Sequence, residues 1–218
     1  MLMAVLLRAQ TTEQAWKLLD ELSAAYTEAS ALDIRFLFLP DAPEHAAYMD
    51  TTRWDAAETI TGQLLLQGDK FRLYLPDMDI LYDGDKMYQF LPEVLEINMT
   101  QPKDTDGAPY GLFARPRQLL SGYRRNFEVS SVKTVRHQGV ALTEIRLSPQ
   151  HQLQQTYRTV TLWIDNRTRH LAALRTEQVD DVVSLIALRS IQPVEIQDVF
   201  EFQLSKYPQG TELIDMTF

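Results

Sequence analysis

Histidine is the side chain that most often binds a metal ion or transfers protons in an enzyme. The chain has four of them: His45, His137, His151 and His170. They are scattered, no pair has the spacing of a metal-binding helix, and there is no cysteine to complete a thiolate site. We therefore expect surface or loop histidines, with neither a metal ion nor a cofactor.

The acidic residues and the glycines do not form a catalytic motif either. Four aspartates lie close together in the sequence: Asp77, Asp79, Asp83 and Asp85. Their spacing differs from that of a calcium-binding loop, which favours solvated turn residues. The eight glycines form no phosphate-binding loop and no Gly-x-Ser-x-Gly turn. An enzyme with a hydrolase or isomerase pocket would need converging titratable groups, and the apolar strands supply few.

Length and charge restrict the classes of protein further. The chain has 218 residues, 45% of them hydrophobic, and we interpret residues 11–218 as one domain. Asp and Glu number 30 against 21 Lys and Arg, and the resulting charge of −9 disfavours nucleic acid as a partner. No apolar run approaches the roughly 18 residues of a membrane span. A soluble monomer is expected.

The first ten residues, MLMAVLLRAQ, allow two interpretations. They are similar to the end of a secretory signal peptide that lacks its basic start, with a cleavage position after Ala9. The apolar stretch is short for such a signal, and an ordinary N-terminus fits equally well.

The rest of the chain is predicted to contain one long helix and many strands. Thr11 and Gln14 fit a capping box, so the helix is expected to begin at Thr11. About twelve short apolar segments follow, ending with VFEFQL (199–204), and turn signals such as Asp83-Gly84 separate them at hairpin spacing. This pattern predicts an antiparallel meander.

A segment in the middle of the chain, PYGLFARPRQLLSGY, interrupts the strands. Pro109 and Pro116 each suit a first helical position, which predicts two short helices. These pieces carry more apolar surface than they need for themselves, and we interpret them as a lid: Tyr110, Leu112, Phe113, Leu119 and Leu120. Four arginines lie beside it, either as a solvated rim or as contacts for lipid head groups or an acidic partner: Arg115, Arg117, Arg124 and Arg125.

Several strands are apolar on both faces, although an antiparallel sheet with one face in water should show a polar face. We therefore expect a mainly β fold with a few helices. In it an antiparallel, curved sheet forms an incomplete half β-barrel around a hydrophobic hollow, covered by the N-terminal helix and the lid. A β-sandwich or closed barrel with a filled core explains the same pattern and remains open.

The order of several motifs resembles that of LolA-type outer-membrane lipoprotein carriers. The stretch GQLLLQGDKFRLYLPDMDILYDGDKMYQFLPE (62–93) is similar to that family's signature, APYGLFAR to its lid segment, and FEFQLSKYPQGTELIDM to its C-terminal pattern. Gln67-Gly68-Asp69 stands where the carriers have Lys-Arg-Pro, whose arginine helps to hold the lid closed. The resemblance implies a LolA/LolB-like fold, and the departure puts the latch and the cargo in doubt.

The resemblance assigns a cavity-lining role to Phe71, and strand alternation adds residues of the same parity. The full set expected to line the cavity is Ile34, Phe36, Phe38, Leu64, Leu66, Phe71, Leu73, Leu75, Ile80, Tyr82, Tyr88 and Phe90. Ordinary core packing is the alternative for each of them.

The family implies a function that is not enzymatic. Its carriers shelter lipoprotein acyl chains in the periplasm of a Gram-negative bacterium, receive them from an inner-membrane release complex and pass them to an outer-membrane acceptor. A carrier of another hydrophobic ligand, such as a biosynthetic lipid or a pigment, fits the same sequence.

Overall fold

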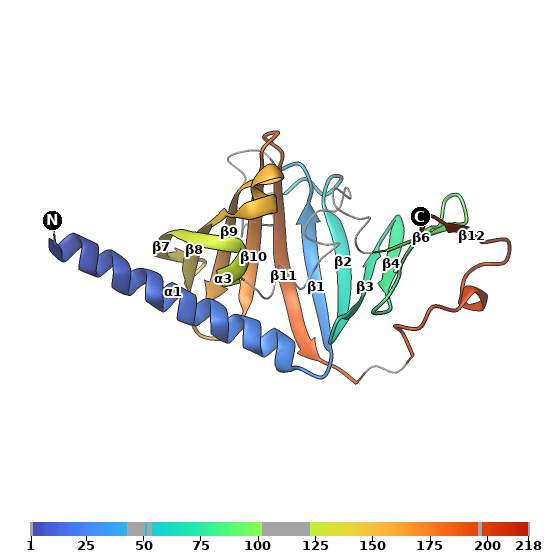
Figure 1. The fold of residues 1–218 in the computed structure, drawn as a ribbon, viewed down its shortest axis with the longest axis horizontal. Coiled ribbons are helices and arrows are strands. Elements are labelled where there is room, and N and C mark those ends of the chain that lie inside the picture. Colours follow the sequence, from blue (N-terminus) through green and yellow to red (C-terminus); the bar gives the residue numbers. More distant parts are fainter. Residues whose placement is uncertain (1, 43–50, 52–53, 102–122, 196–197, 218) are drawn as a thin grey trace. The chain divides into compact units, whose positions relative to one another are not determined.

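The computed structural model describes residues 2–42, 51, 54–101, 123–195 and 198–217 (Figure 1). One long helix, α1 (Leu2–Glu28), opens the chain, and α3 (Tyr123–Asn126), η4 (His151–Gln155) and η5 (Leu204–Lys206) are short. The strands are β1 (Leu32–Leu39), β2 (Ile60–Gln67), β3 (Lys70–Leu75), β4 (Met78–Tyr82), β5 (Met87–Leu91), β6 (Glu96–Thr100), β7 (Phe127–His137), β8 (Val140–Pro149), β9 (Tyr157–Asp165), β10 (Leu171–Gln178), β11 (Val183–Pro193) and β12 (Glu212–Asp215).

These strands form one large, curved sheet that does not close. Its order is β12-β6-β5-β4-β3-β2-β1-β11-β10-β9-β8-β7, so that β12 and β7 are the two end strands. The hairpin pairs from β2 to β6 and from β7 to β11 are antiparallel, and β12 runs parallel to β6. The prediction of a mainly β protein with an unclosed antiparallel sheet and few helices is confirmed.

The chain divides into two compact units, each built from separate segments. Unit 1 comprises Met1–Glu28, Leu37–Thr59 and Gln118–Arg189, and unit 2 comprises Ala29–Phe36, Ile60–Arg117 and Ser190–Phe218. β1 and β11 contribute residues to both units.

In unit 1, α1 packs on the sheet through one side. Leu18, Leu19 and Leu22 are almost fully buried, and the Tyr26 hydroxyl accepts a hydrogen bond from the Leu171 amide at 3.4 Å. The helix begins at Leu2 rather than at Thr11 and continues without a break (Figure 1). The predicted capping box at Thr11 is therefore wrong, because Thr11 lies inside the helix.

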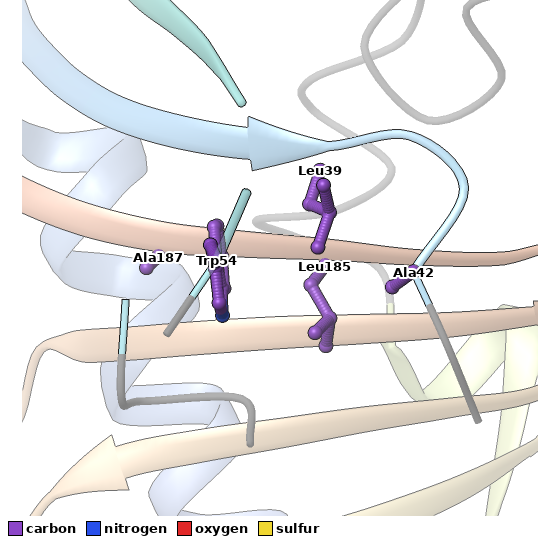
Figure 2. Close-up of a cluster of buried hydrophobic side chains, with 5 residues drawn as sticks. All are labelled: Leu39, Ala42, Trp54, Leu185 and Ala187. Atoms are coloured by element: carbon purple, nitrogen blue, oxygen red, sulfur yellow. The ribbon is translucent and has the colours of Figure 1, made fainter. Parts of the chain in front are cut away.

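A second apolar cluster of unit 1 joins β1 to β11. Trp54 packs with Leu39, Ala42, Leu185 and Ala187 (Figure 2). The Ala42 amide donates to the Val183 carbonyl at 2.7 Å, and Ser184 Oγ donates to the Pro40 carbonyl at 2.7 Å. These bonds fix the chain as it leaves β1.

In unit 2, short turns connect β2 to β6. Asp83 Oδ1 accepts from the amides of Asp85 and Lys86, both at 2.9 Å, and Gly84 has a φ of 106°, which favours glycine. The predicted Asp-Gly turn is confirmed.

The predicted strand VFEFQL is wrong. Its first residues are irregular, Leu204 begins η5, and the last strand of the chain is β12.

A candidate apolar binding face

The strand register of unit 2 brings most of the predicted cavity residues to one face of the sheet. Leu64 lies opposite Leu73, which lies opposite Ile80, and the next row consists of Leu66, Phe71 and Tyr82. Five of these side chains are between 0% and 7% exposed, and we name them the apolar face: Leu64, Leu66, Phe71, Leu73 and Ile80. Side chains alternate between the two faces along each strand, and the pairing of β2, β3 and β4 puts these five on the same face, as the sequence predicts.

Tyr82 and Leu75 continue this face at its margins. The rings of Phe71 and Tyr82 are 5.7 Å apart, while the Tyr82 hydroxyl donates to the Gly84 carbonyl at 2.8 Å. Leu75 is half-buried and lies opposite the buried Met78. Met78 therefore lies on the same face, and so does Met87, which pairs with Tyr82. Neither methionine is among the cavity residues expected from the sequence.

β1 adds Phe36 to the same face. The Phe36 ring lies over Gly62, and Gly62 is on the same face of β2 as Leu64 and Leu66. Ile34 and Phe36 are buried, and Phe38 is half-buried. Three adjacent strands therefore present apolar side chains without a charged residue between them.

Tyr88 and Phe90 do not join this face. Tyr88 lies opposite Leu81 and Phe90 opposite Asp79, so both point to the other side of the sheet. Met87, opposite Tyr82, takes the place that the sequence interpretation gave to an aromatic residue.

On that other side, a C-terminal segment covers the sheet. We call residues 199–207 the strap, and Phe200, Phe202 and Tyr207 are its aromatic residues. Phe202 stacks on Tyr88 with ring centroids 4.0 Å apart and planes within 2°, and Tyr207 meets Phe90 edge-on at 5.1 Å. The cluster under the strap contains Leu81, Tyr88, Ile97, Met99 and the half-buried Leu65 and Phe90. The strap explains why this face of the strands is apolar too.

Arg72 links the strap to the sheet and forms an ion pair with Asp79. Arg72 Nε donates to Asp79 Oδ1 at 3.0 Å, its Nη2 to Oδ2 at 2.5 Å, and its Nη1 to the Val199 carbonyl at 3.2 Å. Burial raises the pKa of the neighbouring Tyr207 to about 12, and the Asp79 carboxylate adds to this shift. The fork geometry of Arg72 thus anchors one end of the strap.

The predicted lid and two of the four arginines lie outside the described residues. The lid residues are Tyr110, Leu112, Phe113, Leu119 and Leu120, and the arginines are Arg115 and Arg117. Arg124 is described: its Nη2 bonds Asp20 Oδ2 at 2.7 Å, and its guanidinium lies 5.1 Å from the Trp16 ring centre. Arg124 is therefore held by α1, whereas Arg125 is exposed.

The described residues contain no group of three or more His, Asp or Glu that could hold a metal ion, and no helix long and apolar enough to cross a membrane. Burial raises the pKa values of Tyr26 and Tyr123, which keeps both phenols neutral. An apolar face without titratable groups suits a hydrophobic ligand.

No family model matches the sequence, and no curated protein matches it. Among solved structures, an uncharacterized conserved protein from Thermus thermophilus is similar, with a TM-score of 0.57 and 8% identity over 93% of this chain and 99% of that one. A DUF1329 family protein from Desulfovibrio piger has a TM-score of 0.50 and 10% identity, covering 88% and 97%. A LolA superfamily protein from Nitrosomonas europaea has a TM-score of 0.44 and 12% identity, covering 86% and 97%. At such identities the likeness concerns the fold alone.

Proposed function

We propose that the protein is a carrier of hydrophobic molecules that shelters acyl chains against the apolar face. The observation that carries this proposal is the shared register of Leu64, Leu66, Phe71, Leu73 and Ile80, which are buried and have no charged neighbour on their face of β2, β3 and β4. Apolar surface of this kind binds alkyl chains through the hydrophobic effect, and no catalytic step is required.

We propose the cargo from the sequence resemblance. The order of motifs resembles the LolA-type carriers, so we propose lipoprotein acyl chains that move from the inner to the outer membrane through the periplasm of a Gram-negative bacterium. In this proposal a monomer takes its cargo from an inner-membrane release complex and delivers it to an outer-membrane acceptor. A carrier of another long-chain lipid or of a pigment is the second candidate, since the same face would accept it.

The energy of burial sets a condition on release. One buried methylene contributes about 0.8 kcal/mol, so a fully buried chain of sixteen carbons gains roughly 12 kcal/mol. Three such chains would exceed the practical ceiling of about 18 to 21 kcal/mol. We therefore propose that cargo is only partly buried, or that the predicted lid, residues 109–122, competes with it for the same surface.

The experiment is displacement of a hydrophobic reporter dye by long-chain acyl compounds. The native protein should make the dye fluoresce. Phe71 is 5% exposed, so the proposal requires the face to open to ligand and water, and Phe71→Glu should then weaken binding without unfolding because an open wall can hydrate a charge. Leu75→Glu is a second test at a half-buried position of the same face, and Val94→Glu, at a side chain 58% exposed, is the matched control. A folded protein that leaves the dye dark contradicts the proposal.

Native mass spectrometry of the purified protein separates the two candidates. Retention of a triacylated peptide supports the lipoprotein cargo, while a single lipid or pigment supports the second candidate.

A further inference from the structure

β12 is an end strand whose outer side has no strand neighbour among the described residues. It is bound to β6 on its inner side, where the Glu212 amide donates to the Leu95 carbonyl and the Met216 amide to the Met99 carbonyl, both at 2.9 Å. In a strand, successive backbone groups point to opposite sides. The N–H and C=O groups of Leu213 and Asp215 therefore point away from β6, toward the side that has no strand neighbour in the described part of the chain.

Apolar side chains are concentrated at this edge. Four large hydrophobic residues are between 37% and 58% exposed here: Val94, Leu213, Ile214 and Met216. Val94 precedes β6, and the other three belong to β12 or follow it. Leu213 and Ile214 project to opposite faces of the strand, so an added strand would cover apolar surface on both sides.

The charges at this edge indicate what the added strand would be. Glu93, Glu212 and Asp215 are exposed, and Glu96 lies opposite Glu212 on the neighbouring strand. Hydrogen bonds from Thr217 and the attraction of Lys86 lower the pKa of Asp215, so its carboxylate stays ionised at neutral pH. Acidic residues at both ends of the strand favour a partner with basic side chains.

A second copy of this edge would bring the same exposed carboxylates toward Glu212 and Asp215, whereas a basic strand would be attracted to them. From these observations we infer that the outer edge of β12 binds an extended, basic segment of a partner protein as an additional strand of the sheet. This inference does not depend on the nature of the cargo.

The test uses the full chain and an acetylated, amidated heptapeptide in which lysine and valine alternate. Backbone amide signals and their hydrogen exchange are followed by NMR while the peptide is added to millimolar concentration. We expect the Leu213 and Asp215 amides to shift and to become at least tenfold more protected. The same peptide with glutamate in place of lysine should bind at least tenfold more weakly.

Two variants at one position separate backbone pairing from side-chain contact. Leu213→Pro removes the outward N–H at a position that does not bond to β6, and should weaken peptide binding about tenfold or more. Leu213→Ala keeps the N–H and should stay within about threefold of the native protein. Unchanged amide signals of β1 to β4 show that each variant folds.

Several results would overturn the inference. These are an absence of shifts at Leu213 and Asp215 with millimolar peptide, equal binding of the acidic peptide, or equal binding by Leu213→Pro. Protection of the Leu213 amide that rises with protein concentration alone would instead identify a second copy as the occupant.

Discussion

The ring of Phe36 occupies the space that a side chain at position 62 would need. A Cβ atom on Gly62 would lie 2.2 Å from Cζ of Phe36 and 2.5 Å from Cε2, far inside van der Waals contact. A glycine inside a strand commonly marks a close approach of this kind. Gly62 thus allows the Phe36 ring of β1 to lie against β2, beside the apolar face.

This contact predicts that Gly62→Ala is destabilising. The ring cannot yield easily because it is 2% exposed, and overpacking of this kind costs about 1 to 3 kcal/mol of the free energy of unfolding. Urea denaturation measures the effect, with Thr61→Ala at an exposed neighbouring position as the control. In the double variant Phe36→Leu/Gly62→Ala the smaller side chain leaves room, so the combined loss should be less than the sum. Strict additivity would contradict the contact.

Much of the sheet could be predicted from sequence because alternation and turns report directly on strands. β3 is one of the short apolar segments that the sequence predicts as strands, and the Asp83-Gly84 turn lies where the sequence places it. The face of each residue follows from parity. Tyr82 pairs with Met87 across a four-residue loop, so the two side chains lie on the same face of the sheet. A loop with another even number of residues would leave them on the same face too.

The sequence interpretation includes Tyr88 and Phe90 among the cavity residues, but their pairing with Leu81 and Asp79 puts both on the other face of the sheet. Their real partners could not be found from local pattern, because Phe202 and Tyr207 come from more than 100 residues further along the chain. The same distance explains the wrong strand at VFEFQL, whose apolar residues serve the strap rather than a ladder. Local pattern also places a helix start at Thr11, although the apolar residues before it continue the helix.

The stacking of Phe202 on Tyr88 predicts that Phe202→Ala weakens the strap. The variant loses an aromatic pair and part of a buried apolar area, together worth about 2 kcal/mol. Hydrogen exchange should show faster exchange in residues 199–207 while β8 and β9 are unchanged. Leu204→Ala is the matched control within the strap, because Leu204 is 43% exposed and its truncation should change stability by less than about 0.5 kcal/mol. If both variants behave alike, the aromatic stack does not hold the strap.

The ion pair under the strap predicts a larger effect for Arg72→Met. This change leaves the Asp79 carboxylate, whose side chain is 15% exposed, without its counter-ion. Breaking a buried pair costs about 3 to 5 kcal/mol, and we expect the lower end because both side chains retain some exposure. Arg72→Met/Asp79→Leu should recover part of the loss, since no unpaired charge remains. Urea denaturation of the three proteins measures this, and a double variant less stable than Arg72→Met would contradict it.

The shifted pKa of Tyr207 predicts how the strap responds to alkaline pH. Burial raises this pKa from 10 to about 12 in the folded protein, and the negative charge of Asp79 adds to the shift. Below pH 10 the phenol is neutral in both the folded and the unfolded state, so its full contribution to stability is present. As pH rises from 10 to about 12, the unfolded state releases the proton first, and the contribution is progressively lost. Tyr207→Phe cannot ionise and should show a shallower loss of stability over this interval.

The comparison of these two proteins isolates Tyr207 from the other tyrosines. Tyr26 and Tyr123 also have raised pKa values, but they are present in both proteins and cancel in the difference. The free energy of unfolding is measured in urea across the interval, together with the near-ultraviolet absorbance of phenolate, which should lose one late-titrating group in the variant. If the difference in stability between the two proteins does not change with pH, Tyr207 ionises as freely in the folded protein as in the unfolded chain. The strap would then not shield it from water.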